Sequence, residues 1–292
     1  MASEKQVIHD DSVWGVTDVT SSKGKDNENF PVGSLLIAQS LRPVVHAYYQ
    51  FARTADDMVD NPFLSSEQKI ARLQALREVL HGERKAPNRE DAQTAVRLRA
   101  LLLEREIPLE TASDLIVAFC WDAEKNRYQS WEELLKYCRY SANPVGRFLL
   151  ALHHETEESW KASDALCTAL QVVNHLQDVS ADLRTLDRCY VPMPWLEEAG
   201  VRIEDLALGR SKPGVRRVFD RILTEVEKLN DQAALLPSFI RDRRMRLEAV
   251  VIVQLCHRLT ERLRYQDPIA ERVALSKADG MRALLHASRF VF

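Results

Sequence analysis

The chain is 292 residues long, with 46% hydrophobic residues, 28% charged residues and a formal net charge of −3. These values are ordinary for a folded globular protein, and the near balance of charge gives no indication of nucleic-acid binding. Only nine residues are glycine, whereas Leu, Ala, Glu and Arg, which favour helices, are abundant. The composition therefore favours an all-α fold.

No segment of the sequence has the pattern of one that enters or crosses a membrane. The first residues, MASEKQVIHDDS, lack the apolar stretch of a signal peptide. The longest apolar runs, at 115–121 and 249–253, are far shorter than the ~20 residues that span a bilayer. The five cysteines have no CxxC or zinc spacing, which is typical of reduced thiols. We therefore expect a cytoplasmic protein, with peripheral contact at the inner membrane as its only membrane association.

Helical patterns follow one another along most of the chain. Residues 1–27 are polar and aperiodic and are predicted to be a flexible arm, whereas the apolar residues beyond them recur with a helical period. The predicted helices cover residues 33–41, 43–61, 66–82, 90–105, 109–127, 131–154, 163–186, 215–236, 238–264 and 276–287. No alternating strand pattern is sustained, and 187–214 is expected to be a connecting loop. The prediction is a single all-α domain over residues 28–292.

Local signals mark the start of two helices and a break in a third. Ser65 to Gln68 and Ser130 to Glu133 have the spacing of capping boxes, which predicts helix starts at both places. Pro144 and Gly146 fall inside the predicted helix 131–154. Because proline cannot donate a backbone hydrogen bond, we expect this helix to kink or break near residue 144.

The stretch FARTADDMVD, residues 51–60, concentrates negative charge on a predicted helix. Like charges at this spacing weaken an isolated helix, so their presence calls for a reason. Spacings of four, three and four residues place one polar stripe along the helix. The stripe consists of Tyr49, Arg53, Asp56 and Asp60, with Asp57 beside it. An apolar stripe next to it is predicted to face the core, and it consists of Tyr48, Ala52, Ala55 and Val59.

A second acidic stretch, NHLQDVSAD at 174–182, repeats this arrangement. Its polar column consists of Gln171, Asn174, Asp178 and Asp182. The adjacent apolar column consists of Val172, Leu176, Val179 and Leu183. His175 follows Asn174 directly, and we expect it to turn away from the polar column. Two helices thus each carry oxygen ligands beside a packing face.

If the two helices face each other in a bundle, five carboxylates line one cavity. Oxygen ligands without His or Cys favour a hard ion, and Mg²⁺ binds in proteins through carboxylates together with substrate phosphates. Arg53 and Tyr49 are then placed to contact phosphate oxygens. The chemistry implied is metal-assisted departure of a diphosphate. The alternative for one such run alone is a solvated helix surface, and a di-iron bundle is disfavoured because Glu-x-x-His pairs are missing.

Several motifs resemble the squalene/phytoene synthases, which condense prenyl diphosphates on an all-α isoprenoid-synthase bundle with a central active-site cavity. They are YYQFARTADDMVD (48–60), YCRYSANPVG (137–146), QVVNHLQDVSADL (171–183) and RCYVP (188–192), and the likeness covers about residues 28–290. ENFPVGS (28–34), SANPVG (141–146) and NHLQD (174–178) are similar to the hydroxysqualene synthase branch of the bacterial hopanoid pathway. The resemblance implies conversion of presqualene diphosphate and water to hydroxysqualene and diphosphate, with Mg²⁺ and without NADPH.

The resemblance also implies a role for individual residues. Mg²⁺ would be held by Asp56, Asp57, Asp60, Asn174, Asp178 and Asp182. Tyr49 and Arg53 match residues that contact diphosphate, Tyr137 matches a tyrosine near the reacting cation, and Phe30 and Gln171 line the pocket. Arg188 and Tyr190 match the loop after the second motif, where Asp187 replaces the usual glycine. Candidates for orienting the quenching water are Asn143, Glu28 and Asn29.

Other functions remain open from the sequence. Within the family, the alternative is a presqualene diphosphate or squalene synthase that acts on farnesyl diphosphate. Outside catalysis, the chain could be an assembly factor or lipid-binding member of the family, or a structural metal-binding bundle, although the retained aspartates argue against a non-catalytic role. The expected partners are presqualene diphosphate, diphosphate, a presqualene diphosphate synthase and, peripherally, a membrane that takes up an apolar product.

Overall fold

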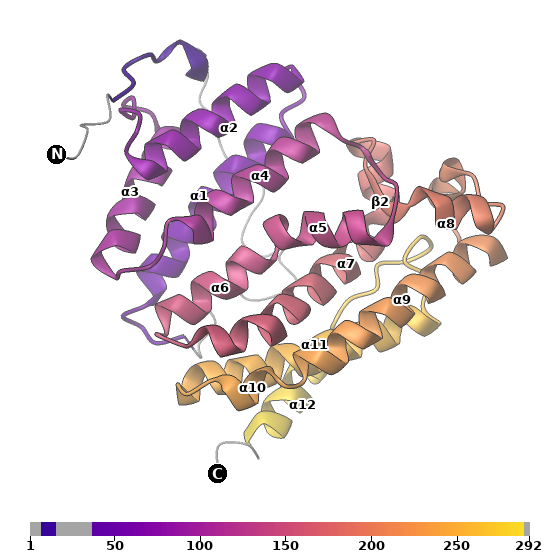
Figure 1. Ribbon diagram of the computed structural model, residues 1–292. Helices are drawn as coiled ribbons and strands as arrows, with labels where there is room; N and C mark the ends of the chain where they lie inside the picture. The colour runs from indigo at the N-terminus through magenta and orange to yellow at the C-terminus, as the bar shows by residue number, and fades with distance from the viewer. Residues whose placement is uncertain (1–6, 16–36, 289–292) are drawn as a thin grey trace. The chain divides into compact units, whose positions relative to one another are not determined.

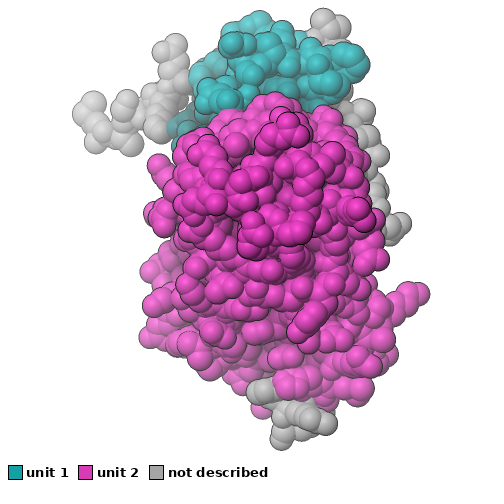
Figure 2. Space-filling view, turned by 90° about the vertical axis from the view of Figure 1, so that its right-hand side faces the viewer, with its two compact units in different colours: residues 1–124 teal, residues 125–292 magenta. Residues whose placement is uncertain are grey.

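Helices make up most of the computed structural model, which describes residues 7–15 and 37–288 (Figure 1). These helices form two compact units, residues 1–124 and residues 125–292 (Figure 2). The prediction of an all-α fold is confirmed, whereas the division into an arm and a single domain over 28–292 stays a prediction. Within the described part of the chain, no helix is both long enough and apolar enough to cross a bilayer.

Four helices build the first unit: α1 (Arg42–Val59), α2 (Ser66–His81), α3 (Glu90–Glu104) and α4 (Glu110–Glu124). Helices α1 and α2 each pack against α3 and α4. The predicted capping box at Ser65 is confirmed, since Ser65 Oγ accepts from the Gln68 amide and the Gln68 side chain accepts from the Ser65 amide. The predicted helix 33–41 is wrong for its described part, because residues 37–41 form turns and α1 begins at Arg42.

Residues 7–15 lie against the loop between α2 and α3. The backbones of Ile8, Glu83 and Lys85 exchange two hydrogen bonds, of 2.8 and 2.9 Å. Trp14, on the short helix η1 (Ser12–Trp14), is buried, and its carbonyl accepts from Arg89 Nη1 at 3.0 Å. The rest of the predicted arm, and Phe30 with Glu28 and Asn29, lies outside the described residues.

The second unit is centred on α7 (Trp160–Thr185), the longest helix, which packs against α5 (Trp131–Ser141), α6 (Asn143–Leu152) and α9 (Pro213–Ala233). Helix α11 (Arg243–Tyr265) packs against α9 and α12 (Lys277–Ser288). The remaining elements are β1 (Arg127–Tyr128), η3 (Glu157–Ser159), β2 (Cys189–Pro192), α8 (Met193–Glu198), η4 (Ile203–Ala207) and α10 (Leu236–Phe239).

Three features of this unit differ from the sequence prediction. The segment 187–214 is not a plain loop, since it holds α8 and β2, which pairs in parallel with β1. The predicted helix 238–264 is two helices, because the chain is extended at Ile240 and Asp242 before α11 begins, with Asp242 Oδ1 accepting from the Met245 amide at 2.8 Å. The capping box at Ser130 is half formed, since Ser130 Oγ accepts from the Glu133 amide but Glu133 accepts from the amide of Gln129.

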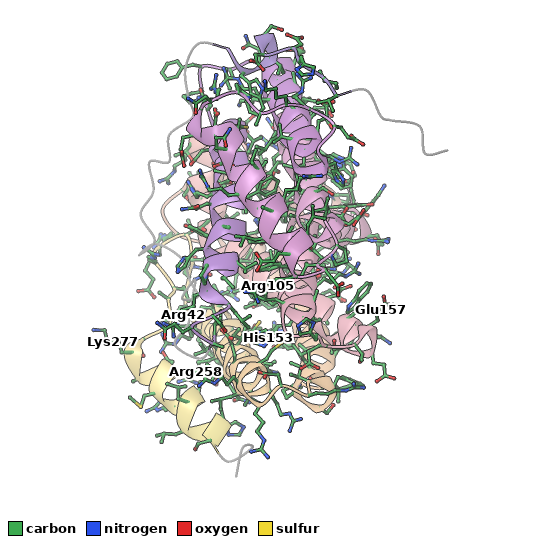
Figure 3. The ribbon with its side chains drawn as sticks, turned by 90° about the vertical axis from the view of Figure 1, so that its left-hand side faces the viewer. Arg42, Arg105, His153, Glu157, Arg258 and Lys277 are labelled. Carbon is green, nitrogen blue, oxygen red and sulfur yellow. The ribbon has the colours of Figure 1, made fainter. Side chains whose placement is uncertain are left out.

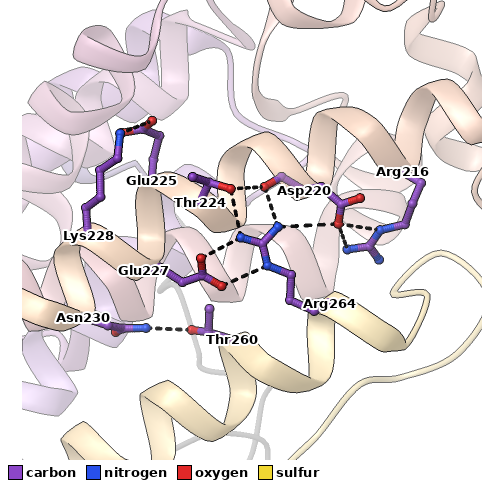
Figure 4. Close-up of polar contacts among 9 residues, drawn as sticks. All are labelled: Arg216, Asp220, Thr224, Glu225, Glu227, Lys228, Asn230, Thr260 and Arg264. Carbon is purple, nitrogen blue, oxygen red and sulfur yellow. Dashed lines mark hydrogen bonds and ion pairs between the residues drawn. The ribbon is translucent and has the colours of Figure 1, made fainter.

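Helices α9 and α11 are joined by a network of polar contacts (Figure 4). Arg264 donates to both carboxylate oxygens of Glu227, at 2.9 and 2.8 Å, and to the Asp220 carbonyl at 2.8 Å. Deeper in the contact, buried Asn230 donates to Thr260 Oγ1 at 3.0 Å. Because buried polar groups cost free energy unless they are paired, this pairing allows the two helices to approach through polar as well as apolar side chains.

The predicted break near residue 144 is confirmed. The backbone of Ala142 leaves the helical region, with φ −126° and ψ −45°, and separates α5 from α6, with Pro144 in the first turn of α6. Gly146 then lies where α6 packs against α7: a Cβ placed there would come within 2.5 Å of Ser163 Oγ and 2.6 Å of Cys167 Sγ. A glycine is therefore needed for the close approach of these two helices.

We expect Gly146→Ala to lower the free energy of unfolding by about 1 to 3 kcal/mol, because the added methyl group overpacks a buried helix contact. The matched control is Gly280→Ala in α12, where a Cβ meets nothing within 4 Å. Since alanine favours helix over glycine by roughly 1 kcal/mol, this control should stabilise the protein slightly. Urea unfolding of both variants tests the opposite signs, and equal effects would contradict the close-approach explanation.

Candidate active site

The first acidic motif lies on α1 in the first unit, and its apolar stripe faces the core as predicted. Tyr48, Ala55 and Val59 are buried, whereas Ala52, the fourth member of the predicted stripe, is partly buried. The Tyr48 hydroxyl donates to the Thr111 carbonyl at 2.7 Å, which fixes α1 against the start of α4. With this face held in the core, the polar stripe comes to lie at the border of the buried face.

One guanidinium joins two carboxylates of this motif. Arg53 Nη1 donates to Asp56 Oδ2 at 2.7 Å, and Arg53 Nη2 donates to Asp57 Oδ1 at 2.8 Å. Burial lowers the pKa of Arg53, but the charges of Asp56 and Asp57, aided by Tyr49, outweigh burial and raise it above its usual range. The other carboxylate oxygen of Asp57, Oδ2, is buried without a hydrogen-bond partner among the described residues. A buried carboxylate oxygen without a hydrogen-bond donor is a favourable ligand for a cation.

The second acidic motif lies on α7 in the second unit. Val172, Leu176 and Val179 are buried as predicted, whereas Leu183 is only partly buried. The polar column is more accessible, because Asp178 is exposed and the other three members are partly exposed, namely Gln171, Asn174 and Asp182. Both motifs therefore have the predicted division between packing face and polar face.

The chain turns sharply where the second motif ends. Asp187 has a φ of +52°, in the left-handed region that favours glycine, which agrees with the glycine that the motif resemblance implies at this position. Hydrogen bonds from the Arg127 side chain hold the pKa of Asp187 below its usual range. Burial opposes this effect, whereas the charge of Arg127 and a hydrogen bond from Asn126 add to it. The turn returns buried Arg188 to the end of α7, with its amide donating to the Asp182 carbonyl at 3.2 Å.

Four rings from four elements form a cluster beside α7. Tyr190 stacks on His175 with ring centres 3.6 Å apart and lies 5.3 Å from Tyr137. Tyr128 completes the cluster, 5.5 Å from Tyr137 and 5.4 Å from Tyr190. The pairing of β1 with β2 brings Tyr128 and Tyr190 together. The structure thus unites Tyr137 and Tyr190, which the sequence singled out, with Tyr128 and His175, which it did not.

His175 is the clearest addition to the predicted site. The residue is partly exposed, but its Nε2 atom is buried and has no hydrogen-bond partner among the described residues. Burial, followed by the charge of Arg188, lowers the pKa of His175 to about 3. The expectation that His175 turns away from the polar column stays a prediction, but its ring lies on Tyr190 and 5.9 Å from Tyr137. Positions 171, 175, 178 and 182 also follow a helical spacing of four, three and four. This spacing was the signal available in the sequence.

We expect His175→Phe to flatten the acid branch of the stability curve. Between pH 6.5 and about 3 the unfolded chain binds a proton that the folded chain excludes, so stability falls as pH decreases through this window and is unaffected above it. The slope is at most about 1.4 kcal/mol per pH unit. Phenylalanine keeps the stacking ring but cannot bind the proton.

Urea unfolding at pH 7 and pH 5 measures this difference. From pH 7 to pH 5 the wild type should lose about 1 to 2 kcal/mol more than His175→Phe. Replacement of the exposed His9 by glutamine is the control and should leave the pH dependence as in wild type. Parallel curves for wild type and His175→Phe would contradict the expectation.

Asn143 lies at the first residue of α6, next to the break. It is buried, and its Oδ1 accepts a hydrogen bond from Thr168 Oγ1 of α7 at 3.0 Å. One acceptor position of its amide is therefore already used in joining α6 to α7. The amide nitrogen takes no part in this hydrogen bond, and the role of Asn143 in orienting water stays a prediction.

No preformed metal-binding site is present among the described residues. Among residues 7–15 and 37–288, no group of three or more His, Cys, Asp or Glu side chains is arranged to hold a metal ion. The two acidic motifs lie in different units. Two cavities in the second unit, of about 750 and 410 Å³, are lined by residues of α9 to α12 and of the α9–α10 turn rather than by predicted site residues.

Comparison with known proteins gives one consistent family. Residues 24–279 match the family model of squalene/phytoene synthase. The hydroxysqualene synthase of Rhodopseudomonas palustris is 41% identical over 259 residues, which cover 89% of this chain and 87% of that protein. The hydroxysqualene synthase of Zymomonas mobilis is 40% identical over 264 residues, with the same coverage.

Solved structures agree on the fold. The crystal structure of the squalene synthase HpnC from Alicyclobacillus acidocaldarius is similar with a TM-score of 0.69 at 32% identity, covering 82% of this chain and 89% of its own. A dehydrosqualene synthase has a TM-score of 0.75 at 20% identity, with coverage of 91% and 93%. At this identity the second likeness supports the fold alone.

Proposed function

The chain belongs to the squalene/phytoene synthase family, and from this premise we propose that it converts presqualene diphosphate and water to hydroxysqualene and diphosphate. It is an enzyme that acts on prenyl diphosphates. The observation that carries the finer proposal is the identity of about 40% to proteins named hydroxysqualene synthase over 89% of the chain. The complete set of aspartates in both acidic motifs agrees with a catalytic role.

In the proposed reaction, the acidic motifs bind Mg²⁺ for the diphosphate end of the substrate. The proposed Mg²⁺ ligands are Asp56, Asp57 and Asp60 in the first motif and Asn174, Asp178 and Asp182 in the second. The ion when bound supplies a Lewis acid that neutralises the departing diphosphate. Arg53, which joins Asp56 and Asp57 in this structure, is positioned to exchange a carboxylate for a diphosphate oxygen and to bind it bidentately.

The ring cluster of the second unit would stabilise the positive charge left on the hydrocarbon. Aromatic faces attract cations, and Tyr137 and Tyr190 present such rings beside α7. A water molecule that attacks a cation needs an acceptor for its hydrogen. Neutral His175 has an unpartnered, buried Nε2 atom against Tyr190, which suits this acceptor role better than the Asn143 oxygen already bonded to Thr168. Arg188 and Gln171 would complete the substrate contacts.

The proposal is tested by incubating the purified chain with Mg²⁺ and either presqualene diphosphate or farnesyl diphosphate, with and without NADPH. Identification of products by mass should give hydroxysqualene from presqualene diphosphate, unaffected by NADPH. Squalene or presqualene diphosphate formed from farnesyl diphosphate would favour the alternative synthase. No product from either substrate would remove the catalytic proposal in favour of a binding or assembly role.

The proposed reaction also implies a source for its substrate and a destination for its product. Its substrate must come from an enzyme that condenses two farnesyl diphosphates, so we propose a functional partnership with a presqualene diphosphate synthase. The C30 product is strongly apolar and would leave the site for a membrane. We therefore place the enzyme in the cytoplasm, in peripheral contact with the inner membrane.

A further inference from the structure

Helix α12 has its large apolar residues on the outside. The side of α12 that packs into the second unit buries Asp279, Ala283 and Ala287. The opposite side exposes Met281 at 60%, Leu284 at 41% and Leu285 at 62%. These positions follow the spacing of three and four residues that places side chains on one helical stripe. Because α12 buries alanine and exposes leucine, its outer side can bind another apolar surface.

Exposed apolar residues of a neighbouring element extend this stripe. Leu235, just before α10, is exposed at 57%, and Phe239, at the end of α10, at 39%. His286, next to Leu285, lines the same 410 Å³ cavity as Pro237 and Ser238 of α10. The end of α12 and α10 are therefore neighbours, and both lie at the same end of the second unit in Figure 1.

Basic residues lie close in the sequence to these apolar residues. Arg241, Arg243 and Arg244 are exposed at the junction of α10 and α11, and their guanidinium groups make no hydrogen bond or ion pair within the described part of the chain. Lys277 and Arg282 are exposed on α12, and Lys277 extends away from the ribbon in Figure 3.

Acidic groups at this end of the unit offset only part of this charge, although Glu157 and Glu158 of η3, which packs against α10, are exposed. Asp242 caps α11, and the Glu155 carboxylate accepts from the backbone amides of Arg241 and Asp242 at 2.7 to 3.0 Å. Asp279 is buried and paired with Arg262. The sequence also continues after α12 with Arg289, Phe290, Val291 and Phe292, which repeats the combination of basic and apolar residues.

We infer that this surface, made of Leu235, Phe239, Met281, Leu284 and Leu285 with Arg241, Arg243 and Arg244, docks the protein on an anionic lipid bilayer. We call it the α10–α12 face. An amphipathic helix with apolar and basic residues binds in the plane of an interface when its apolar side enters the headgroup region and its cations meet anionic lipids. A second copy of the chain fits less well, because the same arginines would face each other and repel.

The test is sedimentation of the full chain with lipid vesicles. Wild type should bind vesicles of phosphatidylcholine that contain about one-third phosphatidylglycerol, and binding should weaken at high salt and in phosphatidylcholine alone. The triple variant Met281→Ser, Leu284→Ser, Leu285→Ser and the triple variant Arg241→Gln, Arg243→Gln, Arg244→Gln should each lower the partition coefficient by about tenfold or more. Because all six side chains are exposed, thermal unfolding should remain close to that of wild type.

Matched controls distinguish binding through the α10–α12 face from nonspecific binding by other exposed apolar residues. Val96→Ser with Leu103→Ser removes exposed apolar residues of α3 and should leave vesicle binding unchanged. A chain with Asp57→Asn should also bind vesicles as wild type does, so the docking inference is independent of the proposed reaction. Unaltered binding by both triple variants would overturn the inference. So would a wild-type dimer that the serine variant dissociates, since the face would then join two copies.

Discussion

Removal of divalent cations with EDTA should lower diphosphate release by on the order of 10³-fold or more, and added Mg²⁺ should restore it. Metal ions stabilise the charge of a leaving group by several kcal/mol, and each 1.36 kcal/mol is a factor of ten in rate. The chain's own cation in the first motif is Arg53, which is shared between Asp56 and Asp57. A single guanidinium that offsets two carboxylates leaves little positive charge for a diphosphate.

The measurement is release of diphosphate from presqualene diphosphate with EDTA, and again after Mg²⁺ is added in excess. Thermal unfolding with and without EDTA is the control, and it should show that the chain stays folded. Full turnover in EDTA would contradict metal dependence and would leave Tyr49, Arg53 and Arg188 as the proposed partners of the diphosphate.

Asp57→Asn and Asp182→Asn should each lower kcat/KM by about 10²- to 10³-fold. Asparagine keeps the size of the side chain but removes the charge that binds a hard cation. In Asp57→Asn the buried Oδ2 position loses its charge, and the 2.8 Å ion pair with Arg53 is lost as well. In Asp182→Asn the second motif loses one of its two carboxylates, while the backbone contact from Arg188 to the Asp182 carbonyl can remain.

Mg²⁺ titrations of both variants provide the decisive measurement. We expect each variant to need a higher Mg²⁺ concentration for half-maximal activity, whereas a purely structural role would lower activity equally at every concentration. Asp231→Asn, an exposed aspartate on α9, is the matched control and should behave as wild type. Wild-type kinetics for Asp57→Asn or Asp182→Asn would remove that residue from the proposed metal ligands.

The sequence alone determined most of the helices and the two-sided character of both motif helices. These properties depend on local periodicity, so the buried faces of α1 and α7 and the cap at Ser65 were predictable. The break before Asn143 was equally local, because Pro144 cannot donate the hydrogen bond that a continuous helix requires. Resemblance of the motifs supplied the family, which the comparisons confirmed.

The tertiary structure decided the contacts that join distant parts of the second unit. The pairing of β1 with β2 is too short for a period-two pattern, yet it brings Tyr128 to Tyr190 and places Tyr190 on His175. The outward leucines of α12 likewise could not be foreseen, because a helical pattern predicts an apolar face without saying whether that face meets the core. Which apolar side is buried depends on packing between elements, and a local pattern does not contain that information.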